Sequence, residues 1–307
     1  MIALLALAVA QTSPVPPHPP GGPQMVMRAP VTPKISGSDS CLPLKFVDFM
    51  PVIQASVGGR TVALGFDTGA PGGPLLHPSI IADLKLGHVG EARMSDPSLT
   101  NIITTPIYGM RDLKIGNLTV DEWTATARPH RESRRFADPD GIIGLTAFAG
   151  YVVTIDYPGG RMLFTKGRLP EPDGKTSFKF EGPIPRVPLS IEGKTIEAHL
   201  DSGNARYALI LPENYASGLP GYANRFPIGI ARTVNNTFNL MALPVQETKV
   251  GELPLYAGTA AYPGPSPSRG NIGSPLLKDM IVKVDPANGI VSLERAKPGL
   301  ESVCPTT

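Results

Sequence analysis

Apolar and polar positions alternate in short runs along most of this chain, and two of the longest runs are copies of each other. Residues 51–69 read PVIQASVGGRTVALGFDTG, and residues 187–203 read VPLSIEGKTIEAHLDSG. In each segment an alternating run, a turn containing glycine and a second alternating run predict a β-hairpin. Both hairpins end on an Asp, a hydroxyl residue and a Gly.

Further landmarks repeat in the same order. Residues 115–118 (IGNL) match residues 250–253 (VGEL), and the segment DGIIGLTAFAGYVVTIDYPGGRMLF matches NIGSPLLKDMIVKVDPANGIVSL. Asp67 and Asp201 are 134 residues apart, and the other matched landmarks are separated by nearly the same distance. These matched segments, in one order and at nearly one spacing, indicate that the chain is an internal duplication.

The repeated pattern predicts an all-β fold. The 33 Gly and 35 Pro residues favour many turns over long helices. We expect two homologous β-barrel-like lobes, residues 44–166 and 178–293, related by a pseudo-twofold axis with a cleft between them. The turn-rich segment 167–177 would connect them. Two short helices are expected, one over residues 79–86 with Ser79 as its N-cap and one over 276–280.

The first 43 residues differ from the rest. Residues 1–10 contain a short apolar run that ends in small residues, which is the pattern of a secretory signal peptide, and a buried N-terminal strand is the alternative. Residues 11–43 are rich in Pro, Gly and Ser and are predicted to be a leader or linker. We therefore expect an exported protein, either periplasmic or secreted.

The composition of the chain excludes some classes of binding partner. Apolar residues make up 41% and charged residues 18% of the chain, as in ordinary globular proteins. The formal net charge is +2 and no run of Lys or Arg exceeds a pair, so neither nucleic acid nor an anionic membrane surface is an expected partner. Apart from the first residues, no stretch approaches the roughly 18 apolar residues of a membrane span.

Two cysteines flank the predicted folded part, Cys41 before it and Cys304 after it. In an exported protein a disulfide between them would tie the two ends of the fold together. The loop-entropy contribution would be up to about 5 kcal/mol. Two free thiols are the alternative.

The candidate chemistry lies in the two repeated tripeptides. One Asp-hydroxyl-Gly sequence alone is weak evidence for a catalytic site, because ordinary turns are rich in such residues. Two of them at equivalent positions of a duplicated fold place Asp67 and Asp201 so that a pseudo-twofold axis brings them together. Carboxylates about 3 Å apart cannot both ionise, so the pair shares a proton, and one member serves as acid while the other serves as base.

These segments resemble a known family. Residues 65–72 (GFDTGAPG) and 199–206 (HLDSGNAR) are similar to the active-site loops of pepsin-like and retropepsin-like aspartic peptidases. The sequences IIG, ending at Gly144, and NIG, ending at Gly273, resemble the elements that support those loops. The resemblance extends over about residues 44–293, and the first half resembles bacterial retropepsin-like domains that usually occur singly and dimerise.

The resemblance implies an aspartic-type endopeptidase, a hydrolase in which water between Asp67 and Asp201 attacks the carbonyl group of a peptide or protein substrate. Proteolysis of this kind uses no metal and no organic cofactor. In the family, the hydroxyl groups of the two loops hydrogen-bond across to each other and hold the pair. Thr68 and Ser202 are expected to make these bonds, and Gly69 and Gly203 complete the set of residues expected to support the dyad. Because both halves belong to one chain, a monomer is expected to be active.

Two features depart from the family or have no firm match in it. Asn271 stands where the family prefers an apolar residue. A flap over the active site is expected within residues 91–108, where Tyr108 is a weak candidate for the flap tyrosine, and a second one around Asn235 and Asn236.

The same residues also bear on other functions. The five His residues are scattered without ligand spacing, so a zinc site is not expected. His199 lies two residues before Asp201, on the same face of its strand, where it would act on the pair or simply be hydrogen-bonded. The rival function is a catalytically silent peptide-binding protein with the same bilobal cleft. A purely structural β protein would not explain why both loops retain Asp, a hydroxyl residue and Gly.

Overall fold

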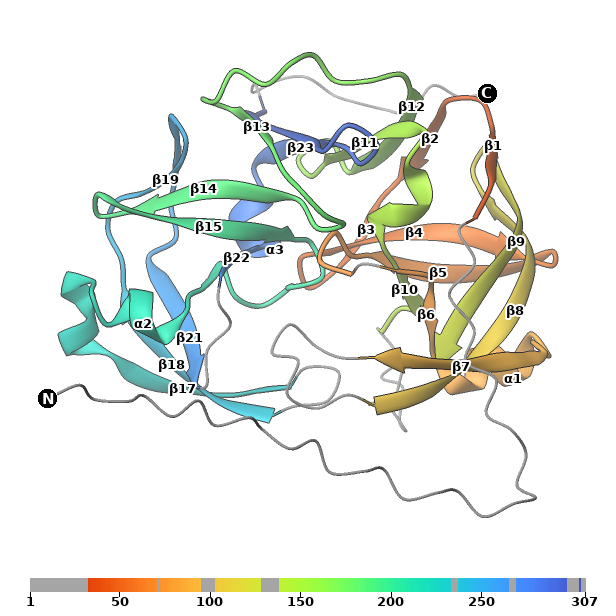
Figure 1. Cartoon of the computed structure of the whole chain (residues 1–307), viewed down its shortest axis with the longest axis horizontal. Coiled ribbons are helices and arrows are strands. Elements are labelled where there is room, and N and C mark those ends of the chain that lie inside the picture. Colours follow the sequence, from red (N-terminus) through yellow and green to blue (C-terminus); the bar gives the residue numbers. More distant parts are fainter. Residues whose placement is uncertain are drawn as a thin grey trace, which may run out of the picture.

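The described part of the fold consists mostly of β-strands, which confirms the all-β prediction (Figure 1). The computed structural model describes residues 33–70, 72–94, 103–127, 138–232, 237–264, 269–296 and 304. Its strands form three sheets, two of nine strands and one of six. The predicted signal sequence, residues 1–10, lies outside the described residues.

The first nine-stranded sheet belongs to the first half of the chain. Its strands are β1 (Ile35–Gly37), β3 (Lys45–Val47), β4 (Met50–Val57), β5 (Arg60–Phe66), β6 (Leu75–Leu76), β7 (His88–Met94), β8 (Ile103–Ile115), β9 (Leu118–Ala127) and β10 (Gly141–Ile143). The order is β1-β9-β6-β10-β5-β4-β8-β7, with β3 beside β4. Because β8 also pairs with β9, the path of hydrogen-bonded strands closes on itself.

The second nine-stranded sheet belongs to the second half. Its strands are β14 (Arg186–Ile191), β15 (Lys194–Asp201), β16 (Leu209–Ile210), β17 (Phe226–Arg232), β18 (Thr237–Pro244), β19 (Thr248–Val250), β20 (Leu253–Leu255), β21 (Thr259–Gly264) and β22 (Gly270–Gly273). The order is β17-β18-β21-β16-β22-β15-β14-β19-β20. The duplication is visible in the pairing, because hairpin β14–β15 repeats hairpin β4–β5 and β22 lies parallel to β15 as β10 lies parallel to β5.

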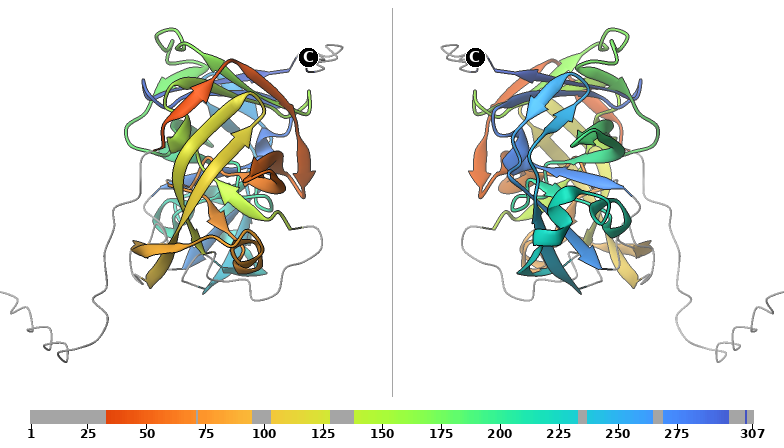
Figure 2. Two further views of the ribbon diagram at one scale, coloured as in Figure 1. Left: turned by 90° about the vertical axis from the view of Figure 1, so that its right-hand side faces the viewer. Right: turned by 90° about the vertical axis from the view of Figure 1, so that its left-hand side faces the viewer.

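The six-stranded sheet joins the halves. It contains β2 (Ser40–Pro43), β11 (Tyr151–Asp156), β12 (Arg161–Lys166), β13 (Ser177–Lys179), β23 (Met280–Asp285) and β24 (Ile290–Arg295) in the order β13-β24-β23-β11-β12-β2. The closing hairpin of each half therefore pairs directly with the other through β11 and β23. In Figure 1 this sheet lies along the top, with the second-half sheet at the left and the first-half sheet at the right, and Figure 2 gives the two side views.

The short helices lie near the predicted positions with shifted ends. Helix α1 (Pro78–Asp83) begins earlier than expected, because Pro78 occupies its first turn and the His77 side chain, not Ser79, caps it by accepting the amide of Ser79. It ends before Lys85, whose φ of 53° breaks the helix. Helix α3 (Ser274–Leu277) begins before the predicted segment 276–280 and overlaps only its first two residues, because Met280 already belongs to β23. The other short helices are η1 (Leu145–Phe148), α2 (Glu213–Ala216) and η2 (Pro220–Asn224).

Two strands lie inside the predicted leader, residues 11–43. Strand β1 pairs with β9, and strand β2 pairs with β12. The proline-dense part of the leader ends at Pro33, and the next residues retain the backbone N–H groups that pairing requires. The strands of the first half therefore begin before residue 44, the boundary predicted from the sequence.

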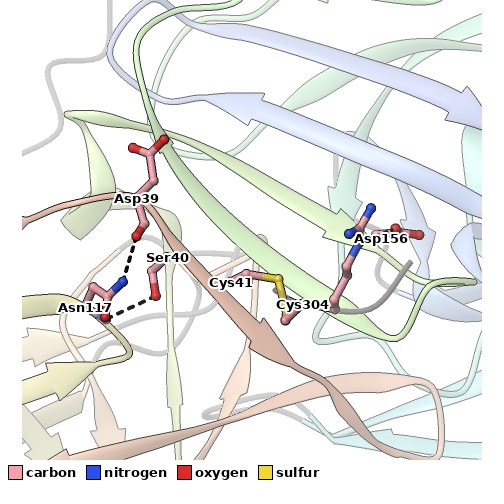
Figure 3. Close-up of a disulfide and its surroundings, with 7 residues drawn as sticks. Asp39, Ser40, Cys41, Asn117, Asp156 and Cys304 are labelled. Atoms are coloured by element: carbon pink, nitrogen blue, oxygen red, sulfur yellow. Dashed lines mark hydrogen bonds and ion pairs between the residues drawn. A yellow bond between two sulfur atoms is a disulfide. The ribbon is translucent and has the colours of Figure 1, made fainter. Parts of the chain in front are cut away.

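The predicted disulfide is present between Cys41 and Cys304, with a Cα–Cα distance of 5.5 Å (Figure 3). It ties Cys304 to β2, an outer strand of the six-stranded sheet. Next to it, Asn117 donates from its backbone amide to Ser40 Oγ at 3.1 Å and from its side chain to the Asp39 carbonyl at 2.9 Å. None of the helices in the described ranges is long and apolar enough to cross a membrane.

Candidate functional site

The two Asp-hydroxyl-Gly loops meet where the two halves of the chain come together. Asp67 follows β5 directly, and Asp201 is the last residue of β15. Four hydrogen bonds join the loops through Thr68 and Ser202. Thr68 Oγ1 donates to the Leu200 carbonyl at 2.6 Å and accepts from Ser202 N at 3.0 Å. Ser202 Oγ donates to the Phe66 carbonyl at 2.6 Å and accepts from Thr68 N at 2.9 Å.

This exchange is reciprocal, because the hydroxyl group of each loop donates to a backbone carbonyl of the other loop and accepts from a backbone amide of it. Both side chains are buried, with relative exposures of 2% for Thr68 and 0% for Ser202. Buried backbone N–H and carbonyl groups are costly when unpaired, so these four bonds fix the loops at one separation and orientation.

The glycines of the tripeptides allow the carboxylate of each loop to lie close to the backbone of the opposite loop. A Cβ atom on Gly69 would lie 2.7 Å from Asp201 Cγ, and a Cβ atom on Gly203 would lie 2.3 Å from Asp67 Cγ. Each carboxylate thus packs against the glycine of the opposite loop. Any larger side chain at either position would displace the carboxylate of the other half.

Backbone amides bind both carboxylates from within their own loops. Asp67 Oδ1 accepts from Gly69 N at 2.8 Å. Asp201 Oδ1 accepts from Gly203 N and from Asn204 N, each at 3.0 Å. These bonds hold the two carboxylate groups in corresponding positions of the two loops.

Gly144 and Gly273, the residues expected to support the loops, lie directly against them. A Cβ on Gly144 would lie 2.0 Å from the Ala70 carbonyl oxygen, and one on Gly273 would lie 2.1 Å from the Tyr207 carbonyl oxygen. Their φ angles of −100° and −87° suit any residue, so close approach of the backbone is what requires glycine here.

Tyr157 is a buried residue near the site that no sequence pattern indicated. Its hydroxyl group lies 2.9 Å from Ser274 Oγ, which in turn donates to the Ser202 carbonyl at 2.9 Å. Burial, followed by the charges of Asp201 and Asp67, raises the pKa of Tyr157 far above its ordinary value. The tyrosine therefore stays neutral and supports the second loop from the six-stranded sheet.

His199 lies on β15 beside Arg186 of β14 and Asn271 of β22. Burial lowers the pKa of its imidazole, and the charges of Arg186 and Arg269 act in the same direction against the opposing effect of Asp201. His199 is thus held in its neutral form to lower pH than a free histidine.

The expected flap segments fall on equivalent hairpins, β7–β8 in the first half and β17–β18 in the second. Residues 95–102 lie outside the described residues, as do Asn235 and Asn236. Tyr108 is paired with His88 at the end of the β7–β8 ladder far from the connecting residues, with the two ring centroids 6.0 Å apart. It lies at the base of that hairpin and not near its tip.

No protein-family model matches the chain, and a search of curated proteins gives no significant match. Within the described ranges, no group of three or more His, Cys, Asp or Glu side chains is arranged to bind a metal ion.

Replacing Thr68 by Val, which has the same shape without the hydroxyl group, is expected to lower the free energy of unfolding by about 1–3 kcal/mol. The change leaves a buried amide at Ser202 and a buried carbonyl at Leu200 without their partner. Urea unfolding measures the effect. Thr61→Val, at an exposed position on β5, the strand that leads into this loop, is the matched control and is expected to change stability by less than about 0.5 kcal/mol. Equal effects of the two variants would contradict a structural role for the cross-loop bonds.

Proposed function

We propose that this chain is an aspartic endopeptidase in which Asp67 and Asp201 activate water to hydrolyse peptide bonds. In this proposal the two nine-stranded sheets are the two lobes of an acid-protease fold, related by a pseudo-twofold axis. The observation that carries the proposal is the reciprocal contact of the two loops, in which Thr68 and Ser202 exchange hydrogen bonds and each carboxylate lies over the opposite glycine.

The proposed chemistry needs one proton on the pair. The ionised carboxylate removes a proton from water while the water oxygen bonds to the peptide carbonyl carbon, and the protonated carboxyl group gives its proton to the carbonyl oxygen. The tetrahedral intermediate then collapses: one of its two hydroxyl groups returns a proton to the carboxylate that is now ionised, the C–N bond breaks, and the amide nitrogen leaves with the proton of the other carboxyl group. Two coupled carboxylates supply both the base and the acid, so the reaction needs no further titrating group.

An exported location is part of the same proposal. The Cys41–Cys304 disulfide supports it, because such bonds persist in oxidising compartments such as the periplasm or the extracellular medium. The substrate would then be a peptide or protein met there, and the active species would be a monomer that carries both aspartates.

The direct test is incubation of the oxidised, purified protein with a diverse peptide library between about pH 3 and about pH 7, with products identified by mass spectrometry. We expect cleavage to be fastest in acid, because the reactive form carries one proton on a coupled carboxylate pair. A statine-type inhibitor should block it, by the resemblance to the family. Cleavage that is fastest above about pH 8, or that chelators abolish, would contradict the proposal. Peptide binding without cleavage would instead support the catalytically silent rival.

A further inference from the structure

Strand β15 carries polar side chains on the same face as Asp201. Side chains alternate between the two faces of a strand, so Glu197 and His199 share the face of Asp201, while Ala198 and Leu200 are buried on the other face. At about 3.3 Å per residue, His199 lies about 7 Å and Glu197 about 13 Å along the strand from Asp201. The surface next to Asp201 is therefore polar in this direction.

The two neighbouring strands add arginines to this surface. Arg186 on β14 lies opposite His199, and Arg269 directly precedes β22, which runs parallel to β15 (Figure 1). Glu197 Oε2 lies 3.5 Å from Arg186 Nη1 and 2.6 Å from Arg269 Nε. Burial, followed by the charges of the two arginines, lowers the pKa of His199, so both guanidinium groups lie near its ring. We call Arg186, Glu197, His199 and Arg269 the arginine cluster.

The arginine cluster carries more positive than negative charge. Two guanidinium groups share the one carboxylate of Glu197, so with a neutral imidazole one positive charge is left over within the cluster. The side chains of Arg186 and Arg269 are 21% and 42% exposed, so a solute can reach both. Arg186 Nε has no hydrogen-bond partner among the described residues, so part of this guanidinium group is unused as a donor.

The corresponding surface of the first half is different next to Asp67. Gly65 stands where the second half has His199, since each lies two residues before its aspartate. A Cβ atom on Gly65 would lie 2.5 Å from Met50 Sδ and 3.4 Å from Pro139 Cγ, so two apolar side chains cover the position that the imidazole occupies in the second half.

The sign of the charge also differs between the halves. The residue that corresponds to Arg269 is Asp140, because each directly precedes the strand that pairs in parallel with the aspartate-bearing hairpin. Asp140 Oδ2 accepts the backbone amide of Ala63 at 2.6 Å. A peptide between the loops would therefore meet a cationic surface only beside Asp201.

We propose that the arginine cluster binds an acidic side chain of the substrate, so that the site selects peptides with Glu or Asp on the Asp201 side of the scissile bond. The inference rests on the proposed function, since it assigns the substrate preference of the same site. Guanidinium groups bind carboxylates through charge-assisted hydrogen bonds, often two at once. The alternative is that the arginine cluster only stabilises the sheet, in which case its arginines have no effect on peptide preference.

The first test is peptide binding by Asp67→Asn, which cannot cleave the peptide that it binds. Short capped peptides of Ser, Ala and Leu carry one Glu at successive positions, and each is compared by fluorescence anisotropy with the same peptide carrying Gln. We expect Glu to bind about 3–10-fold more tightly than Gln at a restricted set of positions. Equal affinity at every position, or no binding of either peptide, would overturn the proposal.

Variants of the arginine cluster should act in opposite directions. Arg186→Gln is expected to reduce the preference for Glu to less than about twofold, and Glu197→Gln to increase it about 2–5-fold, because both guanidinium groups then lose their internal acceptor. Arg60→Gln is the matched control, because Arg60 also pairs with an exposed acid, Asp83 at 3.1 Å, and should leave the preference unchanged. If Arg186→Gln does not fold, Arg269→Gln replaces it. An unchanged preference in the folded arginine variant would overturn the proposal.

The preference should follow the ionisation of the peptide. A Glu side chain has an ordinary pKa of about 4.3, so it is charged at about pH 6 and mostly neutral at about pH 3.5. The titratable groups that face the arginines are Glu197, His199 and Asp201, and the neighbouring Asn271, which donates from Nδ2 to Asp201 Oδ2 at 2.6 Å, is uncharged. Protonation of these groups in acid adds positive charge and would strengthen binding of an anion. Loss of the preference in acid therefore identifies the peptide carboxylate, and a preference that grows in acid would contradict the proposal.

Cleavage by the wild type provides the second measurement. At about pH 6, Glu at the preferred position should raise kcat/KM over Gln by about the factor found in binding, mainly through a lower KM. Arg186→Gln should remove this difference and leave kcat nearly unchanged. A wild type that cleaves no peptide would defeat the proposed function, while binding by Asp67→Asn still decides whether the arginine cluster recognises an acidic side chain.

Discussion

Replacing either Asp67 or Asp201 by Asn is expected to reduce peptide hydrolysis by at least about 1,000-fold, because the remaining carboxylate cannot serve as both acid and base. Asn has the shape of Asp and keeps an oxygen that can accept the amide of Gly69 in one loop or Gly203 in the other. Both variants should therefore fold. Peptide cleavage gives the activity, and circular dichroism checks the fold.

Asp83→Asn is the control for this experiment, since Asp83 is an exposed aspartate of α1 that pairs with Arg60 far from the loops in the fold. It should retain full activity. A homodimer in which equivalent loops pair, Asp67 with Asp67 and Asp201 with Asp201, makes a different prediction. Each single variant would then keep one intact pair and about half of the turnover. Half activity in either folded variant would contradict the intramolecular site.

The local elements of the fold were predictable because their signals are local. Alternation of apolar and polar residues gave the hairpins that became β4–β5 and β14–β15, and the repeat located their counterparts. The pairing of β11 with β23 brings together strands more than 100 residues apart, and the sequence of either strand alone does not predict it. Strands β1 and β2 lie within the predicted leader for the same reason, since each depends on a distant partner.

In the candidate site, too, local features could be predicted from the sequence and contacts between distant residues could not. The repeated tripeptides located both aspartates, and the family resemblance suggested the bonds between Thr68 and Ser202. Tyr157 was missed because its role depends on Ser274, which lies 117 residues away. Asn271 stood out only as a polar residue at an apolar position, and its bond to Asp201 depends on the register of two parallel strands, which composition does not reveal.

Removing the disulfide, with Cys41→Ala and Cys304→Ala combined, is expected to lower the free energy of unfolding by about 3–5 kcal/mol. The two cysteines are 263 residues apart, so the bond closes nearly the whole chain into one loop and restricts the unfolded state strongly. In the folded state it holds β2, whose neighbour in the six-stranded sheet is β12. Urea unfolding of oxidised wild type and double variant measures the difference.

Reduction of the wild type distinguishes the effect of losing the disulfide bond from the effect of replacing the two cysteine side chains. A reductant should destabilise the wild type by about as much as the double substitution does and should leave the double variant unchanged. At temperatures where it remains folded, the double variant should keep peptide cleavage, because the loops are held by Thr68, Ser202 and the pairing of β11 with β23, none of which involves Cys304. A double variant as stable as oxidised wild type would mean that the unfolded chain is already compact enough for its ends to stay close, and the loop-entropy argument would fail.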